Sequence, residues 1–263
     1  MLNSIKIDKN KIPSEILYSL KLNGVCFFPN FLDANFIKDL EEEYDKILSL
    51  PANIVPDHIK NEVIHTKSVN PLSFDFANFP KLKELVNNHF FSKISKLYFK
   101  FQFVCPSKIF LYTTRGIGPE TKKYFLNDKL AFVPHTDETH FLKFFLYLSD
   151  VTIKEGPLAV VPGTQKEFKK IRRQWILKNF DHLSRNKVSE KYNDLFVPLV
   201  GPRGSLTIFD TDVMHKASEI QEGSIRKVIR FDVYSKRENF NALDQKIFLK
   251  FLKLKNRLFN VFQ

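Results

Sequence analysis

The stretch FLKFFLYLSDVTIKEGPLAVVPGTQK, residues 141–166, decides the fold class of this chain. Two short apolar runs, one within the predicted strand 140–148 and one at 158–161, are separated by the turn sequence KEGP at 154–157. Short runs rich in Phe, Leu, Tyr and Val that are bounded by Gly and Pro are typical of strands. The stretch therefore predicts two strands joined by a turn.

Similar runs occur on both sides of this stretch. They predict further strands at 101–105, 108–114, 196–198, 205–209 and 226–234, with turns at 202–204 (PRG) and 221–224 (QEGS). Many short strands delimited by Gly and Pro are typical of an antiparallel sandwich or barrel. The sequence thus predicts a mainly β core.

Helices are predicted on either side of this core. Residues 32–50 have helical apolar spacing with Asp33 as the N-cap, and a second helix is expected from Phe79 or Pro80 to Phe99. The polar segment 51–78 between them is interpreted as loop. No linker or repeat divides the chain, so we expect one domain over 1–263: a helical N-terminal region (1–100), a β core (101–235) with a basic insert (166–191), and a closing amphipathic helix (236–263).

The composition excludes several classes of protein. With 263 residues, 43% of them apolar, the chain can bury a sizeable core, which excludes a disordered protein. Cys26 and Cys105 are too few for a disulfide framework, which favours a reducing compartment. No stretch approaches the roughly 20 apolar residues of a membrane span, and the N-terminus has no apolar signal segment. We therefore expect a soluble cytoplasmic protein.

The net charge of +12 is concentrated in two segments. The insert 166–191 has nine basic and three acidic residues, and 236–263 has seven basic and two acidic residues. A charged segment of this kind is most often a solvated helix face, so the charge does not favour a nucleic-acid partner. As a lid over a binding site, the insert would attract an anionic small molecule through Lys169, Arg172 or Arg173.

The motif PHTDETH, residues 134–140, has the spacing of a metal site. His135 and Asp137 are two residues apart at the entrance to a strand, which places both side chains on one face. A third ligand, His215, is expected in the loop DTDVMHKAS at 210–218. Two imidazoles and one carboxylate form the facial triad of non-haem Fe(II) oxygenases and leave coordination positions open.

An arginine eleven residues after His215 adds to this pattern. Arg226 begins a strand, where its planar guanidinium could grip the far carboxylate of 2-oxoglutarate. Arg230 lies on the same face of the strand and competes for this role, although the spacing from His215 favours Arg226.

At this point the sequence resembles a known family. The runs HTDETHFLKFFLYLSDVTIKEGPLAVVPGTQK (135–166) and GPRGSLTIFDTDVMHKASEIQEGSIRKVIRFDVY (201–234) resemble the phytanoyl-CoA dioxygenase family of Fe(II)/2-oxoglutarate oxygenases. The likeness covers about 108–234, whereas NGVCFFPNFLD at 23–33 matches only in outline. The resemblance implies a double-stranded β-helix, or jelly roll, with iron held by His135, Asp137 and His215 and with 2-oxoglutarate held by Arg226.

The resemblance also implies a reaction. An unactivated C–H bond of a small or medium organic molecule, anionic if the basic insert forms a lid, would be hydroxylated with consumption of O2 and release of succinate and CO2. Halogenating relatives replace the carboxylate ligand with a small residue, so Asp137 favours hydroxylation. A further 2-oxoglutarate contact is expected from the strand that precedes the His135–Asp137 motif, predicted at 108–114. Tyr112 is the candidate, and Lys108 shares its face of that strand.

Two rival functions remain open from the sequence. The jelly roll could be a binding or sensing protein without oxygen chemistry, or an oxygenase that acts on nucleic acid or protein. Consumption of 2-oxoglutarate would exclude the first, and salt-sensitive binding to oligonucleotides would indicate the second. His140, close to the proposed ligands, is interpreted as an ordinary strand residue rather than a metal ligand or a substrate contact.

Overall fold

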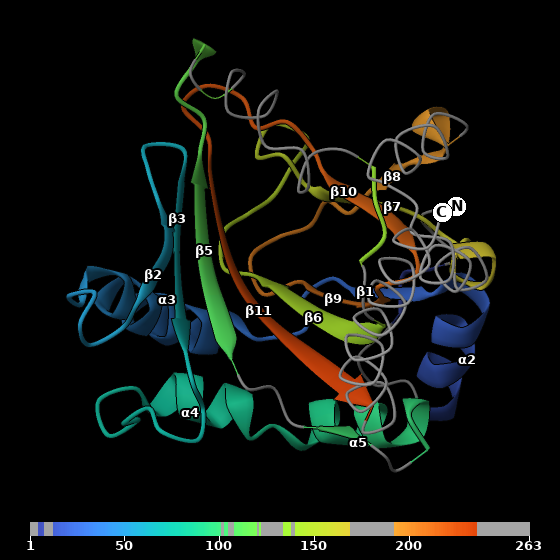
Figure 1. The fold of residues 1–263 in the computed structure, drawn as a ribbon, viewed down its shortest axis with the longest axis horizontal. Coiled ribbons are helices and arrows are strands. Elements are labelled where there is room, and N and C mark those ends of the chain that lie inside the picture. The colour runs from blue at the N-terminus through green and yellow to red at the C-terminus, as the bar shows by residue number, and fades with distance from the viewer. Residues whose placement is uncertain are drawn as a thin grey trace, which may run out of the picture.

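Two antiparallel β sheets face each other, and helices cover the outer face of the larger sheet (Figure 1). The computed structural model describes residues 5–7, 13–100, 103–104, 108–119, 121, 134–137, 140–168 and 192–235. The larger sheet has eight strands in the order β1-β9-β6-β11-β5-β3-β2, with β4 paired to β11, and the smaller sheet has the order β10-β7-β8. This arrangement confirms the predicted mainly β fold with flanking helices and a jelly-roll core.

The strands of the larger sheet are β1 (Val25–Phe28), β2 (Asp57–Lys60), β3 (Ile64–Val69), β4 (Phe103–Val104), β5 (Ile109–Arg115), β6 (Phe141–Tyr147), β9 (Leu206–Asp210) and β11 (Ile225–Ser235). Those of the smaller sheet are β7 (Leu158–Val161), β8 (Val197–Pro198) and β10 (Met214–Ala217). The helices are α2 (Pro13–Asn23), α3 (Ala34–Ser49), α4 (Pro80–Val86) and α5 (His89–Tyr98).

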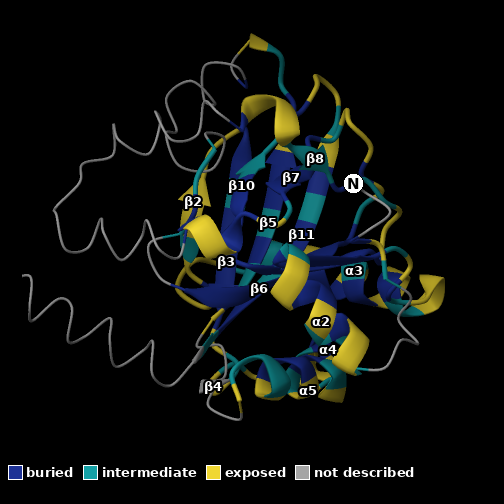
Figure 2. Cartoon of the chain, turned by 90° about the vertical axis from the view of Figure 1, so that its right-hand side faces the viewer, coloured by how far each residue is buried: buried dark blue, intermediate teal, exposed yellow. Residues whose placement is uncertain are grey.

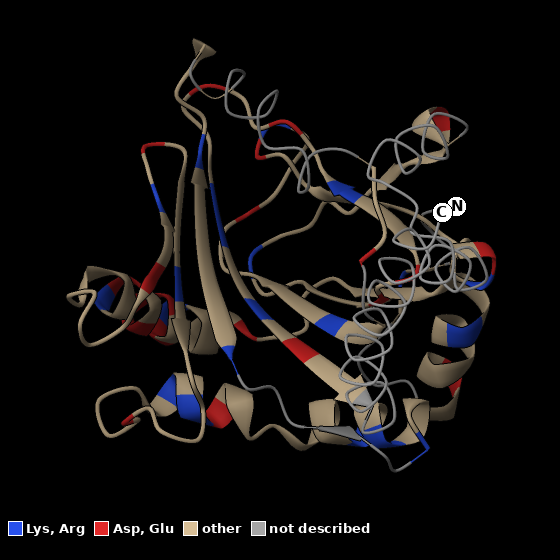
Figure 3. Cartoon of the chain, viewed as in Figure 1, with Lys and Arg blue, Asp and Glu red and all other residues tan. Residues whose placement is uncertain are grey.

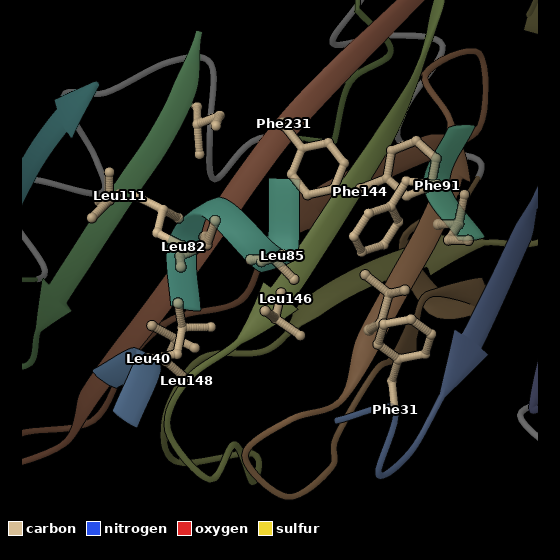
Figure 4. Packing of buried hydrophobic residues seen from close by; sticks show 14 of the residues in the cluster. Phe31, Leu40, Leu82, Leu85, Phe91, Leu111, Phe144, Leu146, Leu148 and Phe231 are labelled. Carbon is tan, nitrogen blue, oxygen red and sulfur yellow. The ribbon is translucent and has the colours of Figure 1, made fainter. Parts of the chain in front are cut away.

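Strand β6 shows how the sequence divides the core in two. Phe144 and Leu146 point to the helices, whereas Phe145 and Tyr147 point into the space between the sheets. Side chains alternate because the strand has a period of two residues, so a run that is apolar except for Lys143 serves both faces. On the helical side, the rings of Phe144 and Phe231 stack with centroids 5.0 Å apart, beside Phe91 of α5 (Figure 4).

Side-chain hydrogen bonds stabilise the first turns of α3 and α4. Asp33 caps α3 as predicted, since its carboxylate accepts a hydrogen bond of 2.9 Å from the backbone N–H of Phe36. Glu43, which is buried in α3, accepts the backbone N–H groups of Lys81 and Leu82 in the first turn of α4. Exposed residues gather on the outer sides of the helices and on the loops, whereas the strands are mostly buried (Figure 2).

The prediction of one continuous helix from Phe79 or Pro80 to Phe99 is wrong. The structure has two helices, α4 and α5, because the Asn88 side chain accepts the backbone N–H of Phe90 and starts a new helix. Asparagine is a favoured N-cap, so the signal for this break was present in the sequence at 87–88.

The interpretation of 51–78 as loop is also wrong, because this segment contains β2 and β3. Apolar alternation is weak here, since the strand interior holds Lys67 instead of an aliphatic residue. Lys67 is 1% exposed, and its Nζ donates to the carbonyls of Leu50 and Val55 at 2.7 and 2.8 Å and lies 3.1 Å from an oxygen of Asp57. A buried ammonium with three oxygen partners can replace an apolar side chain in a core.

Residues 1–100 are therefore not only helical, since β1, β2 and β3 belong to the larger sheet. Of the predicted strand 101–105, the structure describes only β4. The basic insert from residue 169 to 191 and the predicted closing helix 236–263 lie outside the described residues. Among the described helices, none is long and apolar enough to cross a membrane.

Candidate metal centre

His135 and His215 meet across an antiparallel β bridge. The backbone N–H of His135 donates to the carbonyl of His215 at 3.0 Å, and the reverse bond is 2.9 Å. Their imidazole centroids are 4.3 Å apart. The prediction that His215 lies in a loop is wrong, because it lies in β10. This strand could not be predicted from the sequence, because β10 has only four residues and pairs with β7 and His135, both distant along the chain.

Asp137 completes a compact group with the two histidines. One ligand atom from each of His135, Asp137 and His215 can be chosen so that all three lie within 4.8 Å of one another. The Asp137 backbone N–H donates to the Thr211 carbonyl at 3.1 Å, which ties this residue to the turn between β9 and β10. The structure therefore brings together the three residues that the sequence spacing singled out.

The protonation of His215 suits a metal ligand. Its Nδ1 lies 2.8 Å from the carbonyl oxygen of Val213, which can only accept, so Nδ1 carries the proton and Nε2 carries the lone pair. Nε2 is buried and has no hydrogen-bond partner among the described residues. Burial, followed by the nearby His135 and Lys143, holds the pKa of His215 well below its usual value, which favours the neutral imidazole.

Lys143 is a member of this group that the sequence pattern did not reveal. Its Nζ donates to Asp137 Oδ2 at 2.6 Å. Burial alone would raise the pKa of Asp137, but Lys143 and then the two imidazoles outweigh it and hold that pKa below its usual value. Asp137 is therefore a carboxylate, and it lies against the Lys143 ammonium and the imidazoles of His135 and His215.

This donor set fits Fe(II). Two imidazole nitrogens and one carboxylate oxygen are the ligands of the facial triad, and the orphaned Nε2 of His215 is aimed at the shared space. A closed structural zinc site would instead supply four protein ligands.

Two of the proposed ligands, His135 and His215, border a cavity of about 180 Å³ between the two sheets. Arg226, on β11, lines the same cavity and is buried, yet its Nε and Nη1 have no hydrogen-bond partner among the described residues. Burial lowers the pKa of this guanidinium, and Tyr147 opposes that shift. A buried guanidinium without an anion is costly, so the cavity is suited to a ligand carboxylate at Arg226.

Arg230 and Tyr112 also line this cavity. The Arg230 Nη2 lies 3.2 Å from an oxygen of Asp232, and the guanidinium packs over Tyr112 with its carbon 5.1 Å from the ring centroid. Arg230 thus already has a carboxylate partner, whereas Arg226 has none among the described residues. Lys108 is exposed and does not border this cavity; it lines a different one of about 630 Å³, together with His58 and Asp75.

A second group of buried polar residues, around Asp210, lies next to the candidate metal ligands. Asp210 accepts hydrogen bonds from the Tyr98 hydroxyl and the Asp212 backbone N–H, and the Nε2 of His140 lies 3.1 Å from its carboxylate. Ligand atoms of His140, Asp210 and Asp212 also lie within 4.8 Å of one another. Because protein donors already satisfy the Asp210 carboxylate, we assign this group a structural role in holding the turn that bonds Asp137. His140 is more than an ordinary strand residue.

Comparison with protein families gives one match. The family model described as phytanoyl-CoA dioxygenase (PhyH) matches residues 20–228. No curated protein matches the chain.

Several solved structures share the fold. The non-haem α-ketoglutarate-dependent carbocyclase SnoK from nogalamycin biosynthesis has a TM-score of 0.60 and 14% identity, over 88% of this chain and 87% of that chain. EctD from S. alaskensis, solved with 2-oxoglutarate and 5-hydroxyectoine, has a TM-score of 0.58 and 14% identity over 87% and 79% of the two chains. The epimerase SnoN, also from nogalamycin biosynthesis, has a TM-score of 0.57 and 13% identity over 85% and 83%.

Proposed function

The chain belongs to the phytanoyl-CoA dioxygenase family of Fe(II)- and 2-oxoglutarate-dependent oxygenases, and from this membership we propose that it hydroxylates an unactivated C–H bond of a small or medium organic molecule. One atom of O2 enters the substrate and the other enters succinate, while 2-oxoglutarate loses CO2. The bound Fe(II) supplies the activation of O2, and the two electrons that O2 requires beyond those of the C–H bond come from 2-oxoglutarate.

The proposal assigns the metal to His135, Asp137 and His215. Support comes from the proximity of their ligand atoms and from the lone pair that the Val213 carbonyl leaves at His215 Nε2. Three protein ligands leave room for the 2-oxoglutarate chelate and for O2, as the reaction requires.

The proposal assigns 2-oxoglutarate to Arg226, with Tyr112 as a second contact. The single observation that carries the proposal is that Arg226, with its orphaned donors, borders the same cavity of about 180 Å³ as the candidate ligands His135 and His215. The far carboxylate would bind the guanidinium bidentately, and the other end would face the metal. Tyr112 lies across from Val228 in the pairing of β5 and β11 and lines the same cavity.

The walls of the cavity exclude water and orient the substrate. Phe145, Leu158, Phe209 and Val228 provide apolar surface between the sheets. Such surroundings strengthen the electrostatic contact at Arg226 and restrict side reactions. They favour a small molecule over a macromolecule as the substrate, and we propose that residues 1–263 act as one oxygenase domain.

The experiment that tests the proposal begins with the full chain under anaerobic conditions. Fe(II) and 2-oxoglutarate are added while the visible charge-transfer absorption of the chelate is followed, then O2 is admitted and succinate is measured. The variants His135→Ala and Arg226→Met are compared with Arg203→Met, a half-exposed arginine that pairs with Glu41 and Asp150 at 3.4 Å. We expect the absorption band to be lost in His135→Ala, weakened in Arg226→Met and unchanged in Arg203→Met.

The product decides between hydroxylation and other outcomes on this fold. Because SnoK is described as a carbocyclase and SnoN as an epimerase, the product of a responding compound is analysed by mass spectrometry after reaction under ¹⁸O2. Incorporation of one labelled oxygen atom supports hydroxylation. No band and no succinate from folded, iron-loaded protein would refute the proposed function.

A further inference from the structure

Lys143 has an unusual position for a charged side chain. It lies in the middle of the larger sheet, opposite Phe209 on β9 and opposite Asp232 on β11, and its side chain faces the cavity. It is 7% exposed, and its Nζ lies 5.3 and 5.5 Å from the ring centroids of Phe141 and Phe209. Figure 3 shows the corresponding basic and acidic bands side by side on β6 and β11. A buried ammonium requires an anion close by.

That anion is Asp137, one of the proposed metal ligands. The contact of 2.6 Å joins Nζ to Oδ2, the carboxylate oxygen that lies 3.7 Å from His215 Nε2, where a metal ion would bind. When a divalent cation binds Asp137, the carboxylate charge is drawn to the metal and the two cations repel each other. Lys143 then has to find a second anion within reach of its flexible side chain.

None of the described residues that line the cavity is acidic. Asp232 faces Lys143 across the strands, but it already pairs with Arg230 at 3.2 Å. Three cations line the cavity (Lys143, Arg226 and Arg230), and two of them pair with carboxylates that lie outside its lining, Lys143 with Asp137 and Arg230 with Asp232. Fe(II) and the 2-oxoglutarate dianion cancel each other, so one positive charge remains after both have bound.

We propose that Lys143 binds the single negative charge of the primary substrate, and that it becomes available for this role when the metal displaces it from Asp137. This inference rests on the proposed function and names its substrate class: a monocarboxylate with an apolar body. One excess charge matches one carboxylate, and Phe145, Leu158 and Phe209 offer the apolar contacts.

Metal and substrate binding are coupled in this arrangement. The metal releases Lys143 for the substrate carboxylate, and the carboxylate in turn holds Lys143 away from Asp137, so each ligand raises the affinity for the other by the same factor. Lys143 therefore opposes metal binding in the absence of substrate and orders the two binding events.

The first test measures metal affinity without catalysis. Co(II) is titrated into the metal-free full chain by calorimetry for the wild type, Lys143→Met and Lys216→Met. Lys216 is the matched control, because it neighbours His215 but its Nζ lies 4.6 Å from the Phe196 ring centroid. We expect Lys143→Met to bind Co(II) about tenfold more tightly and Lys216→Met to match the wild type. Lys143→Gln serves if the methionine variant does not fold, as judged by its thermal melt.

The second test measures binding of the anion. Hexanoate and benzoate, with hexanamide and benzamide as uncharged counterparts, are titrated into the protein saturated with Co(II) and 2-oxoglutarate. We expect the wild type to bind at least one carboxylate, and to bind it about tenfold more weakly when Co(II) is omitted. Lys143→Met should lose about tenfold in affinity for the carboxylate and nothing for the amide.

Three results would overturn the inference. The first is that wild type and Lys143→Met bind Co(II) with equal affinity. The second is that the wild type binds the carboxylates no more tightly than the amides. The third is that Lys143→Met loses affinity for 2-oxoglutarate, which would assign the lysine to the cosubstrate. Each is scored on wild-type protein that binds Co(II) and 2-oxoglutarate. If the wild type binds neither, the proposed function itself fails, and the two failures are thus distinguished.

Discussion

The backbones of His135 and His215 bind each other through two hydrogen bonds, of 3.0 and 2.9 Å, so that two candidate metal ligands are set by β pairing. Both residues lie at the cavity between the sheets, and the bridge needs no side chain to form. The imidazoles are therefore held in place before a metal binds, which lowers the entropic cost of assembling the site.

His215→Ala should remove a ligand without unfolding the site, because the bridge uses only backbone atoms. We expect Co(II) affinity to fall at least about a hundredfold, with little change in the melting temperature of the metal-free protein. Calorimetric titration and a thermal melt measure the two quantities. His89→Ala, an exposed histidine on α5, is the control. Unchanged Co(II) affinity in His215→Ala would remove His215 from the ligand set.

Arg226 and Arg230, four residues apart on one strand face, should respond in opposite directions to replacement by methionine. Arg226→Met removes a buried charge whose Nε and Nη1 have no partner among the described residues, so the cofactor-free protein should gain about 1 kcal/mol of unfolding free energy. Arg230→Met leaves Asp232 buried without its partner at 3.2 Å and should cost about 3 kcal/mol. Urea unfolding of both variants without ligands checks the signs, and a loss in Arg226→Met would contradict the assignment of its guanidinium to an absent anion.

Asp210 should give the protein acid-sensitive stability. Burial raises the pKa of this carboxyl, but the interactions with His140 and Tyr98 outweigh it and leave the pKa below the ordinary 3.8. The unfolded chain therefore binds a proton first as pH falls, so the stabilisation is present above about pH 4 and is lost on the way down to the folded-state pKa. The free energy of unfolding should fall less steeply below about pH 4 in Asp210→Asn than in the wild type.

The control for this measurement is Asp39→Asn, on the exposed side of α3. It should keep the pH dependence of the wild type. A parallel dependence in Asp210→Asn and the wild type would show that the network around Asp210 adds nothing to acid sensitivity.

Gly24→Ala should disturb the metal centre from a distance. Gly24 has a φ of +71°, and a Cβ there would lie 2.2 Å from Cγ2 of Val213, whose carbonyl accepts the Nδ1 proton of His215. We expect a loss of about 2 kcal/mol in unfolding free energy and a measurable fall in Co(II) affinity. Gly163→Ala is the contrast, because its φ of +86° is also positive but no atom lies within 4 Å of the added Cβ. An equal fall in metal affinity in both variants would exclude the contact with Val213 as the cause.

The fold could be predicted where the signal was local. Apolar runs bounded by turns located most strands of the core, and Asp33 located the start of α3. β1, β3 and β10 were missed because their partners β9, β5 and β7 are far along the chain. β2 was missed because it is short and pairs only with β3, where a buried lysine interrupts the apolar pattern.

The site could be predicted in its ligand types but not in its charge balance. The spacing of His135 and Asp137 and the position of Arg226 indicated the chemistry, since ligand type and strand parity are visible in a sequence. Lys143 resembled one polar residue in an apolar strand, and only the pairing of β6 with β9 and β11 brings it to Asp137 and opposite Asp232. Long-range register determines such contacts, and composition does not reveal it.

The outermost strands of the larger sheet bear on whether copies of the protein can polymerise through their sheets. β2 is short, its register with β3 shifts between Asp57 and Ile59, and it carries the exposed Lys60, so it offers a poor template to an incoming strand (Figure 1). At the opposite margin, the backbone N–H of Ile7 donates to the Phe27 carbonyl of β1 at 2.9 Å and uses an acceptor that another chain would need. Both margins are thus protected against fibril-like addition, one by irregularity and charge and the other by a covering segment of the same chain.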